Sequence, residues 1–170
     1  MKLFKTASEI AAAVSTTARE IDAAYAGASS PIVAVCVLKG ALHFYSDLTR
    51  RLHVPLEFEF IRASSYGNGR ESSGRVEYLA DVGIPLRGRS VLIVEDIVET
   101  GRTLAALRTR FLNAGAADVK IAALLDKPNK RKTDVPVEFR CFTADDLYLV
   151  GYGLDDAEKY RELPDLLYVD

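Results

Sequence analysis

The stretch from residue 91 to residue 104 constrains this chain most, because it predicts a strand, a loop and the start of a helix in that order. Residues 91–94, Val-Leu-Ile-Val, are all apolar, and Glu95 and Asp96 follow them directly. A strand that is buried on both faces has such a continuous apolar run, which is typical of a parallel sheet in an α/β protein. The two acids therefore stand at the end of the strand where ligands bind in open α/β sheets.

The loop after these acids has the composition of a phosphate-binding loop. Residues 100–103, Thr-Gly-Arg-Thr, lead into apolar residues at helical spacing, namely Leu104, Leu107 and Phe111, before a stop at Gly115. Free backbone N–H groups at a helix start, a glycine that allows close approach and two hydroxyl groups can together bind a phosphate. A Walker loop is excluded, because Asp96 stands where its first glycine is needed. A dinucleotide fingerprint is also excluded, because Asp156 replaces the third glycine after Gly151 and Gly153.

Glu95 and Asp96 need a different part of the ligand, because carboxylates would repel a phosphate bound in the same loop. A divalent metal ion or a pair of hydroxyl groups would suit them, and a sugar phosphate offers a diol as well as a phosphate. Taken singly, Glu95, Asp96 and Glu99 could each be a solvated loop acid. The ordered series of strand, acids, loop and helix favours a sugar-phosphate site.

Composition narrows the class of protein. The 170 residues are enough for one domain, spanning residues 1–170, with a core that needs no disulfide or metal. The net charge of -2, from 22 basic and 24 acidic residues, argues against a nucleic-acid surface. Cys36 and Cys141 lie in apolar runs and are expected to be buried and reduced. The longest apolar run, residues 31–38, is too short to span a membrane, so we expect a cytoplasmic protein.

The remaining segments predict further elements of an α/β domain. Thr6 and Glu9 form a capping-box pattern before a helix that ends near Gly27. Apolar residues at helical spacing predict a second helix, which carries Phe44, Tyr45, Leu48 and Leu52. Continuous apolar runs predict strands at residues 31–38 and 119–125. Alternation predicts a half-exposed strand at residues 54–60, and Pro136 makes residues 135–139 an edge strand.

Several other positions are ambiguous when only their residue types are considered. Lys39-Gly40 at a strand end is usually a surface turn, and Tyr148 in an apolar run is usually core. The basic residues among 127–132 would ordinarily form a solvated loop in an acidic chain. The glycine-rich segment 64–74 would ordinarily be a hairpin tip.

Residues 91–104, Val-Leu-Ile-Val-Glu-Asp-Ile-Val-Glu-Thr-Gly-Arg-Thr-Leu, resemble the phosphoribosyl diphosphate (PRPP) loop of type I phosphoribosyltransferases, in particular of the hypoxanthine-guanine branch. The resemblance extends over most of the chain. It implies a central, mostly parallel sheet flanked by helices, a small hood and a mobile lid loop. It also implies an enzyme of purine salvage that transfers 5-phosphoribosyl from PRPP to hypoxanthine, guanine or xanthine and releases diphosphate.

The resemblance assigns one set of residues to PRPP. Glu95 and Asp96 would hold the ribose hydroxyls, and the 5′-phosphate would be held by Thr100, Gly101, Arg102 and Thr103. Lys39 and Gly40, in the turn after the strand at residues 31–38, would bind diphosphate together with Arg161. In the family the peptide bond at this turn can be cis. The expected cofactor is Mg²⁺, with Asp155, Glu95 and Asp96 as its protein ligands.

A second set is assigned to the purine and the lid. Lys127 would donate to the 6-oxo group, Tyr148 would stack on the ring, and Leu149 would offer its carbonyl. Ser65 and Tyr66 match the family's Ser-Tyr lid, which would keep water from the reacting sugar. Glu99 stands where the family usually has Asp, at N7 of the purine, and it keeps the carboxylate while adding one methylene.

Two other functions remain open from the sequence. One is a regulator that binds PRPP or a purine nucleotide without turnover, for which Glu99 is the only hint. The other is a phosphoribosyltransferase for orotate or adenine, against which Lys127 and the segment 148–155 argue. The resemblance further implies a homodimer or homotetramer, with no nucleic acid and no membrane as partner.

Overall fold

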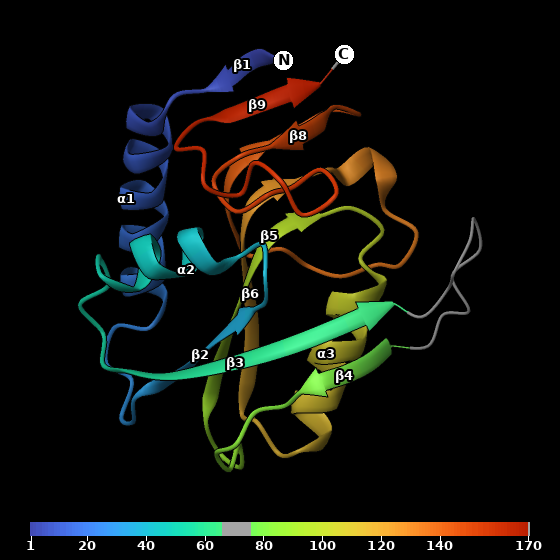
Figure 1. Cartoon of the computed structure of the whole chain (residues 1–170). Helices are drawn as coiled ribbons and strands as arrows, with labels where there is room; N and C mark the ends of the chain where they lie inside the picture. Colours follow the sequence, from blue (N-terminus) through green and yellow to red (C-terminus); the bar gives the residue numbers. More distant parts are fainter. Residues whose placement is uncertain (66–75, 170) are drawn as a thin grey trace.

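A computed structural model describes residues 1–65 and 76–169, and its centre is a six-stranded sheet with the order β4-β3-β2-β5-β6-β7 (Figure 1). The strands are β2 (Ile32–Val37), β3 (Leu56–Ser65), β4 (Val76–Ala80), β5 (Ser90–Val98), β6 (Asp118–Asp126) and β7 (Phe139–Thr143). All of them run parallel except β4, which is antiparallel to β3. The expected mostly parallel sheet is confirmed.

Helices cover both faces of this sheet. α1 (Ala7–Ala24) and α2 (Leu42–Thr49) pack on one face, and α3 (Arg102–Asn113) packs on the other (Figure 1). In β5, Leu92 and Val94 are buried in the core under α1 and α2. Val91 and Ile93 are buried in the core under α3. The strand is therefore apolar throughout because both of its faces are covered.

The sheet grows in opposite directions from the adjacent strands β2 and β5. The chain passes from β2 to β3 and β4 on one side, and from β5 to β6 and β7 on the other. Crevices for ligands form at the carboxyl ends of strands at such a switch point. β2 ends at Val37, just before Lys39 and Gly40, and the end of β5 carries Glu95 and Asp96.

A second sheet of three antiparallel strands, in the order β1-β9-β8, lies beside the two chain ends (Figure 1). Its strands are β1 (Lys2–Lys5), β8 (Tyr148–Val150) and β9 (Leu166–Val169). The loop between β8 and β9 reaches the switch point, because a Cβ atom added to Gly153 would lie 2.0 Å from the carbonyl oxygen of Gly40. This sheet corresponds to the small hood that the resemblance implies.

The predicted start of the first helix is confirmed. The Glu9 N–H group donates to Thr6 Oγ1 at 3.2 Å, and the Thr6 N–H group donates to Glu9 Oε2 at 2.8 Å. This reciprocal capping box satisfies two N–H groups that the helix cannot pair internally.

Two predicted elements differ at their boundaries. The edge strand begins at Phe139 and not at residue 135, because Val135 packs into the core under α3 and Pro136 offers no N–H group to a ladder. The second helix ends at Thr49, so Leu52 lies in the connection to β3. A short 3₁₀ helix, η1 (Pro128–Lys130), follows β6.

In β3 the exposure of the side chains is the reverse of what alternating apolar and acidic residues suggest. Phe58 and Phe60 are 54% and 40% exposed, although Tyr45 contacts both rings. Glu57 and Glu59 are the better covered residues, because Arg89 pairs with Glu57 and the Gly83 N–H group donates to Glu59. The apolar face of this strand is thus only half covered.

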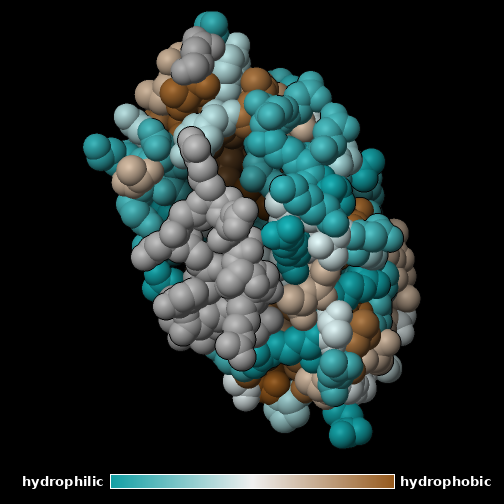
Figure 2. Space-filling view, turned by 90° about the vertical axis from the view of Figure 1, so that its right-hand side faces the viewer, coloured by the Kyte–Doolittle hydropathy of each residue, from teal (hydrophilic) through white to brown (hydrophobic). Residues whose placement is uncertain are grey.

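Among the described residues, both cysteines are free thiols, and no helix is long and apolar enough to cross a membrane. Burial raises the pKa of Cys36 to about 12 and that of Cys141 to about 11, so neither is a reactive thiolate. The face in Figure 2 is mainly hydrophilic, with separate hydrophobic spots.

Candidate functional site

A cavity of about 520 Å³ lies at the carboxyl ends of β2 and β5. It brings together many residues that the sequence assigns to PRPP and Mg²⁺. These are Lys39, Gly40, Glu95, Asp96, Glu99, Thr100, Gly101, Arg102, Thr103, Asp155 and Arg161. They come from β5, from the turn after β2, from the start of α3 and from the loop between β8 and β9.

Glu95 and Asp96 form the carboxylate floor of this cavity. Glu95 is only 8% exposed, and its burial, followed by the charge of Asp96 beside it, raises its pKa well above the ordinary range. Burial also raises the pKa of Asp96. The Ile97 N–H group donates to Asp96 Oδ1 at 2.7 Å, and within the described residues neither acid forms an ion pair. The floor is therefore ready for hydroxyl donors or a cation.

Gly40 lies directly against the floor. A Cβ atom at this position would stand 1.6 Å from Asp96 Oδ2, which no side chain can tolerate. The Leu38–Lys39 peptide bond of the same turn is cis. The resemblance anticipated a cis bond here, and the sequence alone would not reveal the close approach of Gly40 to Asp96.

Lys39 and Arg161 form the cationic rim of the cavity. Lys39 Nζ lies 3.0 Å from Glu158 Oε2, and Arg161 Nη2 lies 2.7 Å from Asp155 Oδ1 and 3.5 Å from Glu158 Oε2. Arg161 Nη1 donates to the Gly153 carbonyl at 2.7 Å. The hydrogen bond from Lys39 is the main reason why the pKa of Glu158 is lowered. Sequence reasoning missed Glu158, since an acid in an exposed loop carries no signal of its own.

The predicted phosphate loop opens α3 as expected. Gly101 is the N-cap residue with a φ of 78°, and no side chain caps the helix. The Thr100 carbonyl accepts from the Lys132 and Thr133 N–H groups, both at 3.0 Å. The helix start therefore presents backbone N–H groups toward the cavity, and the segment after η1 holds the loop in place.

Arg131 is a second residue that sequence reasoning missed. Its guanidinium pairs with the buried Asp126 and donates from Nη1 to the Glu99 carbonyl at 3.3 Å. The Arg131 side chain is only 17% exposed, whereas Lys132 beside it is exposed. The solvated-loop interpretation of this basic segment is therefore wrong for Arg131, which links the end of β6 to the phosphate loop.

Lys127 and Glu99 meet beside the floor. Lys127 is 4% exposed, and its Nζ donates to Glu99 Oε1 at 2.7 Å and to the Leu147 carbonyl at 2.8 Å. Lys127 is therefore not part of a solvated loop, as the resemblance implies for this residue. Tyr148 is 54% exposed and its hydroxyl donates to the Asp155 carbonyl at 3.3 Å, while Leu149 is buried. Of the residues assigned to the purine and its proton, only Glu99 lines the cavity, whereas Lys127, Tyr148 and Leu149 lie outside its lining.

The remaining predicted positions are only partly described. Ser65 is the last residue of β3, and its side chain is outside the described part. Tyr66 lies outside the described residues. For the metal prediction, no three His, Cys, Asp or Glu side chains in the described part could hold an ion by themselves. Asp155 with the floor still fits Mg²⁺, because this ion commonly takes one or two carboxylates and completes its shell with substrate oxygens.

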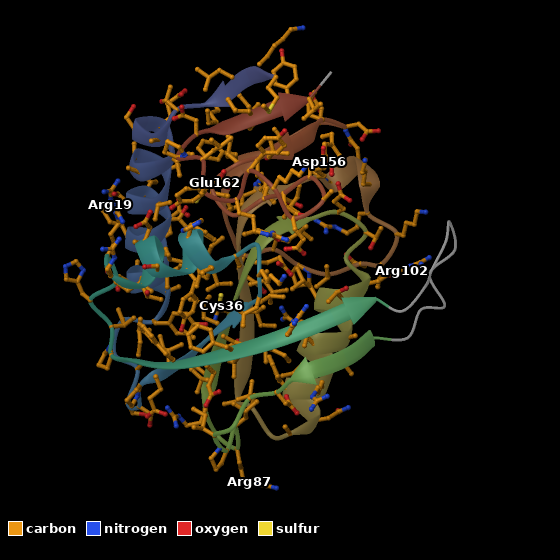
Figure 3. The ribbon with its side chains drawn as sticks, viewed as in Figure 1. Arg19, Cys36, Arg87, Arg102, Asp156 and Glu162 are labelled. Carbon is orange, nitrogen blue, oxygen red and sulfur yellow. The ribbon has the colours of Figure 1, made fainter. Side chains whose placement is uncertain are left out.

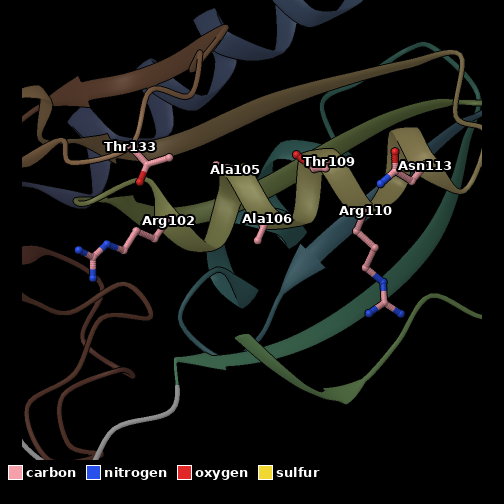
Figure 4. A pocket seen from close by; sticks show the side chains of 7 residues that line it. All are labelled: Arg102, Ala105, Ala106, Thr109, Arg110, Asn113 and Thr133. Atoms are coloured by element: carbon pink, nitrogen blue, oxygen red, sulfur yellow. The ribbon is translucent and has the colours of Figure 1, made fainter. Parts of the chain in front are cut away.

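A larger hollow of about 810 Å³ runs along the outer side of α3 (Figure 4). Apart from two arginines, Arg102 and Arg110, its lining consists of alanine, threonine and asparagine, and it contains no carboxylate. Figure 3 shows Arg102 on the right-hand side of the molecule, at a height between Asp156 above it and Cys36 below it. Of these two hollows, only the cavity at the strand ends carries both carboxylates and cations.

A parallel α/β fold with strand-end acids and a phosphate-type helix start defines a protein that binds a phosphorylated sugar or nucleotide. The family model of the phosphoribosyl transferase domain matches residues 4–157, and the chain belongs to this family. The expected family is thus confirmed.

Relatives agree with this assignment. The chain is 42% identical over 156 residues to a hypoxanthine phosphoribosyltransferase of Salmonella typhimurium, covering 92% of this chain and 88% of that protein. It is 46% identical over 140 residues to a hypoxanthine-guanine phosphoribosyltransferase of Streptococcus thermophilus, covering 82% and 77%. A solved Trypanosoma cruzi hypoxanthine phosphoribosyltransferase, studied for the role of its C-terminal region in oligomeric state and activity, superposes with a TM-score of 0.94. It is 36% identical and the superposition covers 100% of this chain and 91% of that one. The type I phosphoribosyltransferase fold is confirmed.

Proposed function

We propose that this chain is a purine-salvage enzyme that transfers the 5-phosphoribosyl group of PRPP to a ring nitrogen of hypoxanthine, guanine or xanthine. The observation that carries the proposal is the arrangement of the cavity. PRPP has a ribose diol, a 5′-phosphate and a diphosphate, and the cavity offers the carboxylate floor, the start of α3 and the cationic rim. No observation favours a regulator without turnover.

In the reaction, the bond between ribose C1 and the diphosphate oxygen breaks, and a bond from the purine nitrogen to C1 forms. Positive charge develops on the sugar ring near Glu95 and Asp96, which stabilise it. Lys39 and Arg161 bind the departing diphosphate, and Gly40 allows it to approach the backbone. Mg²⁺ bound through Asp155 and the floor would neutralise part of the charge on the leaving group.

The purine is held at the other side of the floor. Lys127 donates to the 6-oxo group, Tyr148 stacks on the ring and the Leu149 carbonyl accepts from the base. Glu99 accepts the proton of N7, and its contact with Lys127 places it beside the base. Adenine has an amino group where Lys127 needs an acceptor, so it would be rejected by as much as about 10⁴-fold.

The test is diphosphate release from PRPP and Mg²⁺ with hypoxanthine, guanine, xanthine and adenine offered separately. We expect turnover with one or more of the oxopurines and none with adenine. Turnover with adenine alone would contradict the role of Lys127. Binding of PRPP with silence for every base would contradict the enzyme and favour the regulator.

We further propose a cytoplasmic homodimer or homotetramer. The Trypanosoma cruzi relative has been studied for its oligomeric state, and free thiols are typical of a reducing compartment. Phe58 and Phe60 are exposed on one face of β3, as expected of an apolar surface that a second copy would bury. Light scattering of the purified protein would measure the subunit number, and a monomer at micromolar concentration would contradict the proposal.

A further inference from the structure

The Glu158 carboxylate bridges the two cations of the rim. Its Oε2 atom lies 3.0 Å from Lys39 Nζ and 3.5 Å from Arg161 Nη2. Lys39 comes from the turn after β2, and Arg161 comes from the loop between β8 and β9. One exposed acid therefore contacts two positive groups that lie far apart in the sequence.

The local backbone fixes Glu158 in this position. Ala157, Glu158 and Tyr160 all have positive φ angles, of 48°, 66° and 75°, in a region that side-chain-bearing residues rarely adopt. Asp156 and Lys159 exchange backbone hydrogen bonds across this turn, at 3.1 Å and 3.0 Å. The Glu158 N–H group also donates to Asp155 Oδ2 at 2.8 Å. Three hydrogen bonds thus hold this unfavourable backbone, and the Glu158 side chain extends from it to Lys39 and Arg161.

We propose that Glu158 is an internal counter-anion, which competes with diphosphate for Lys39 and Arg161. This inference rests on the proposed function, in which these two cations bind the diphosphate. The Glu158 carboxylate already accepts one Lys39 N–H group and offsets part of the positive charge of both cations, so diphosphate must displace it or share these cations with it. The charge of the carboxylate then remains close to the diphosphate and disfavours it further.

This competition lowers the affinity for substrate and product by the same factor, but its consequence for the two differs. PRPP and diphosphate lose the same factor of affinity at the rim, but PRPP keeps its contacts with the floor and with the start of α3. Diphosphate alone has only the rim and its metal ion. Glu158 therefore shortens the residence of the product and lowers inhibition by diphosphate, while the substrate still binds.

The test compares Glu158→Gln with Glu162→Gln in the full chain. Glutamine keeps the length of the side chain and the backbone N–H bond to Asp155, and removes only the charge. Glu162 is an exposed acid next to Arg161, and among the described residues it forms no ion pair with either rim cation. It controls for a general change of charge. Calorimetry would measure the Kd of three ligands in the presence of Mg²⁺, which are diphosphate, PRPP and a purine nucleoside 5′-monophosphate.

We expect Glu158→Gln to tighten diphosphate and PRPP by about two- to five-fold, the factor that corresponds to exposed ion pairs. The monophosphate should be unaffected, because it has no group at the rim. Damage to the loop would weaken binding instead of tightening it. Unchanged or weaker diphosphate binding in Glu158→Gln, or equal tightening in Glu162→Gln, would overturn the inference. Failure of the wild-type protein to bind PRPP at all would instead overturn the proposed function.

Discussion

The carboxylate floor and the cationic rim are parts of one cavity, but they compensate their charges differently. Glu95 is buried and Asp96 is half-buried, and no cation in the described part of the chain forms an ion pair with them. Lys39 and Arg161 are more accessible, and each already pairs with an acid. The floor therefore lacks a positive partner until a ligand binds, whereas the rim cations can exchange one anionic partner for another.

This difference indicates what each part contributes. Buried acids without a cation reduce the stability of the fold, and such a cost is expected where a ligand supplies the missing partner. Exposed ion pairs contribute little stability, so exchanging one anion for another at the rim is nearly free. We therefore expect substitutions at the floor to change activity much more than substitutions at the rim.

The largest effect is expected for Glu95→Gln. Turnover should fall by about 10²- to 10³-fold, because a charge that is directed at the developing cation is lost. The folded-state pKa of Glu95 is raised above its ordinary value of 4.5, so the folded state holds a proton that the unfolded state releases. Wild-type stability should consequently fall as pH rises from about 4.5 through the raised pKa. Glu95→Gln should make this decline smaller, because only Asp96 then keeps a raised pKa at the floor.

Two measurements check this prediction. Thermal unfolding without ligands, at several pH values, should show Glu95→Gln to be more stable than the wild type at neutral pH by on the order of 1 kcal/mol. Diphosphate release measures the loss of turnover. A variant that is less stable at neutral pH and equally active would show that the floor is an ordinary pair of structural acids.

Glu99→Gln tests an acid beside the floor that does have a cation, Lys127. Turnover with hypoxanthine should fall by about 10²-fold or more if Glu99 accepts the N7 proton. Glu99→Asp is the matched control, since it keeps the charge and should retain activity. Normal turnover in the glutamine variant would refute this role of Glu99. A large loss in both variants would mean that the length of the side chain matters more than its charge.

Gly40→Ala should disturb the carboxylate floor and the turn that carries Lys39 of the cationic rim at the same time. The added Cβ would stand 1.6 Å from Asp96 Oδ2, so the turn after β2 or the Asp96 carboxylate must move. A displacement of about 1 Å can cost roughly 10²-fold in turnover. Gly83→Ala is the control, because its nearest atom is 3.8 Å away. Normal kinetics in Gly40→Ala would mean that the geometry of the floor tolerates displacement.

The sequence predicts those parts of the site that lie close together in the chain. β5, its acids and the start of α3 follow one another within residues 90–103, and local patterns of apolar spacing and turn chemistry are enough to recognise them. The capping box of α1 is local in the same way. The strand β1 has only four residues and was not anticipated, because its pairing with β9 depends on the far end of the chain.

The parts that the sequence missed depend on contacts between distant segments. The exposure of Phe58, the contact of Glu158 with Lys39 and the burial of Arg131 are set by neighbours that no local pattern specifies. Lys127 and Arg131 show this clearly, because a run of basic residues predicts a solvated loop while the fold buries Lys127 and covers most of the Arg131 side chain. Resemblance to a family recovered Lys127, and only the structure recovered Arg131.

Arg131→Met should have the smallest effect on activity, although it affects stability. Its guanidinium positions the phosphate loop through the Glu99 carbonyl and does not line the cavity, so we expect KM for PRPP to rise by about 10-fold with a smaller change in kcat. The buried Asp126 would lose its partner, which should cost about 3 kcal/mol of unfolding free energy. Lys132→Met removes a charge from the exposed neighbour and should change neither quantity. If Arg131→Met lowered stability while KM for PRPP stayed constant, the loop would be held by the backbone bonds to Thr100 alone, and Arg131 would be purely structural.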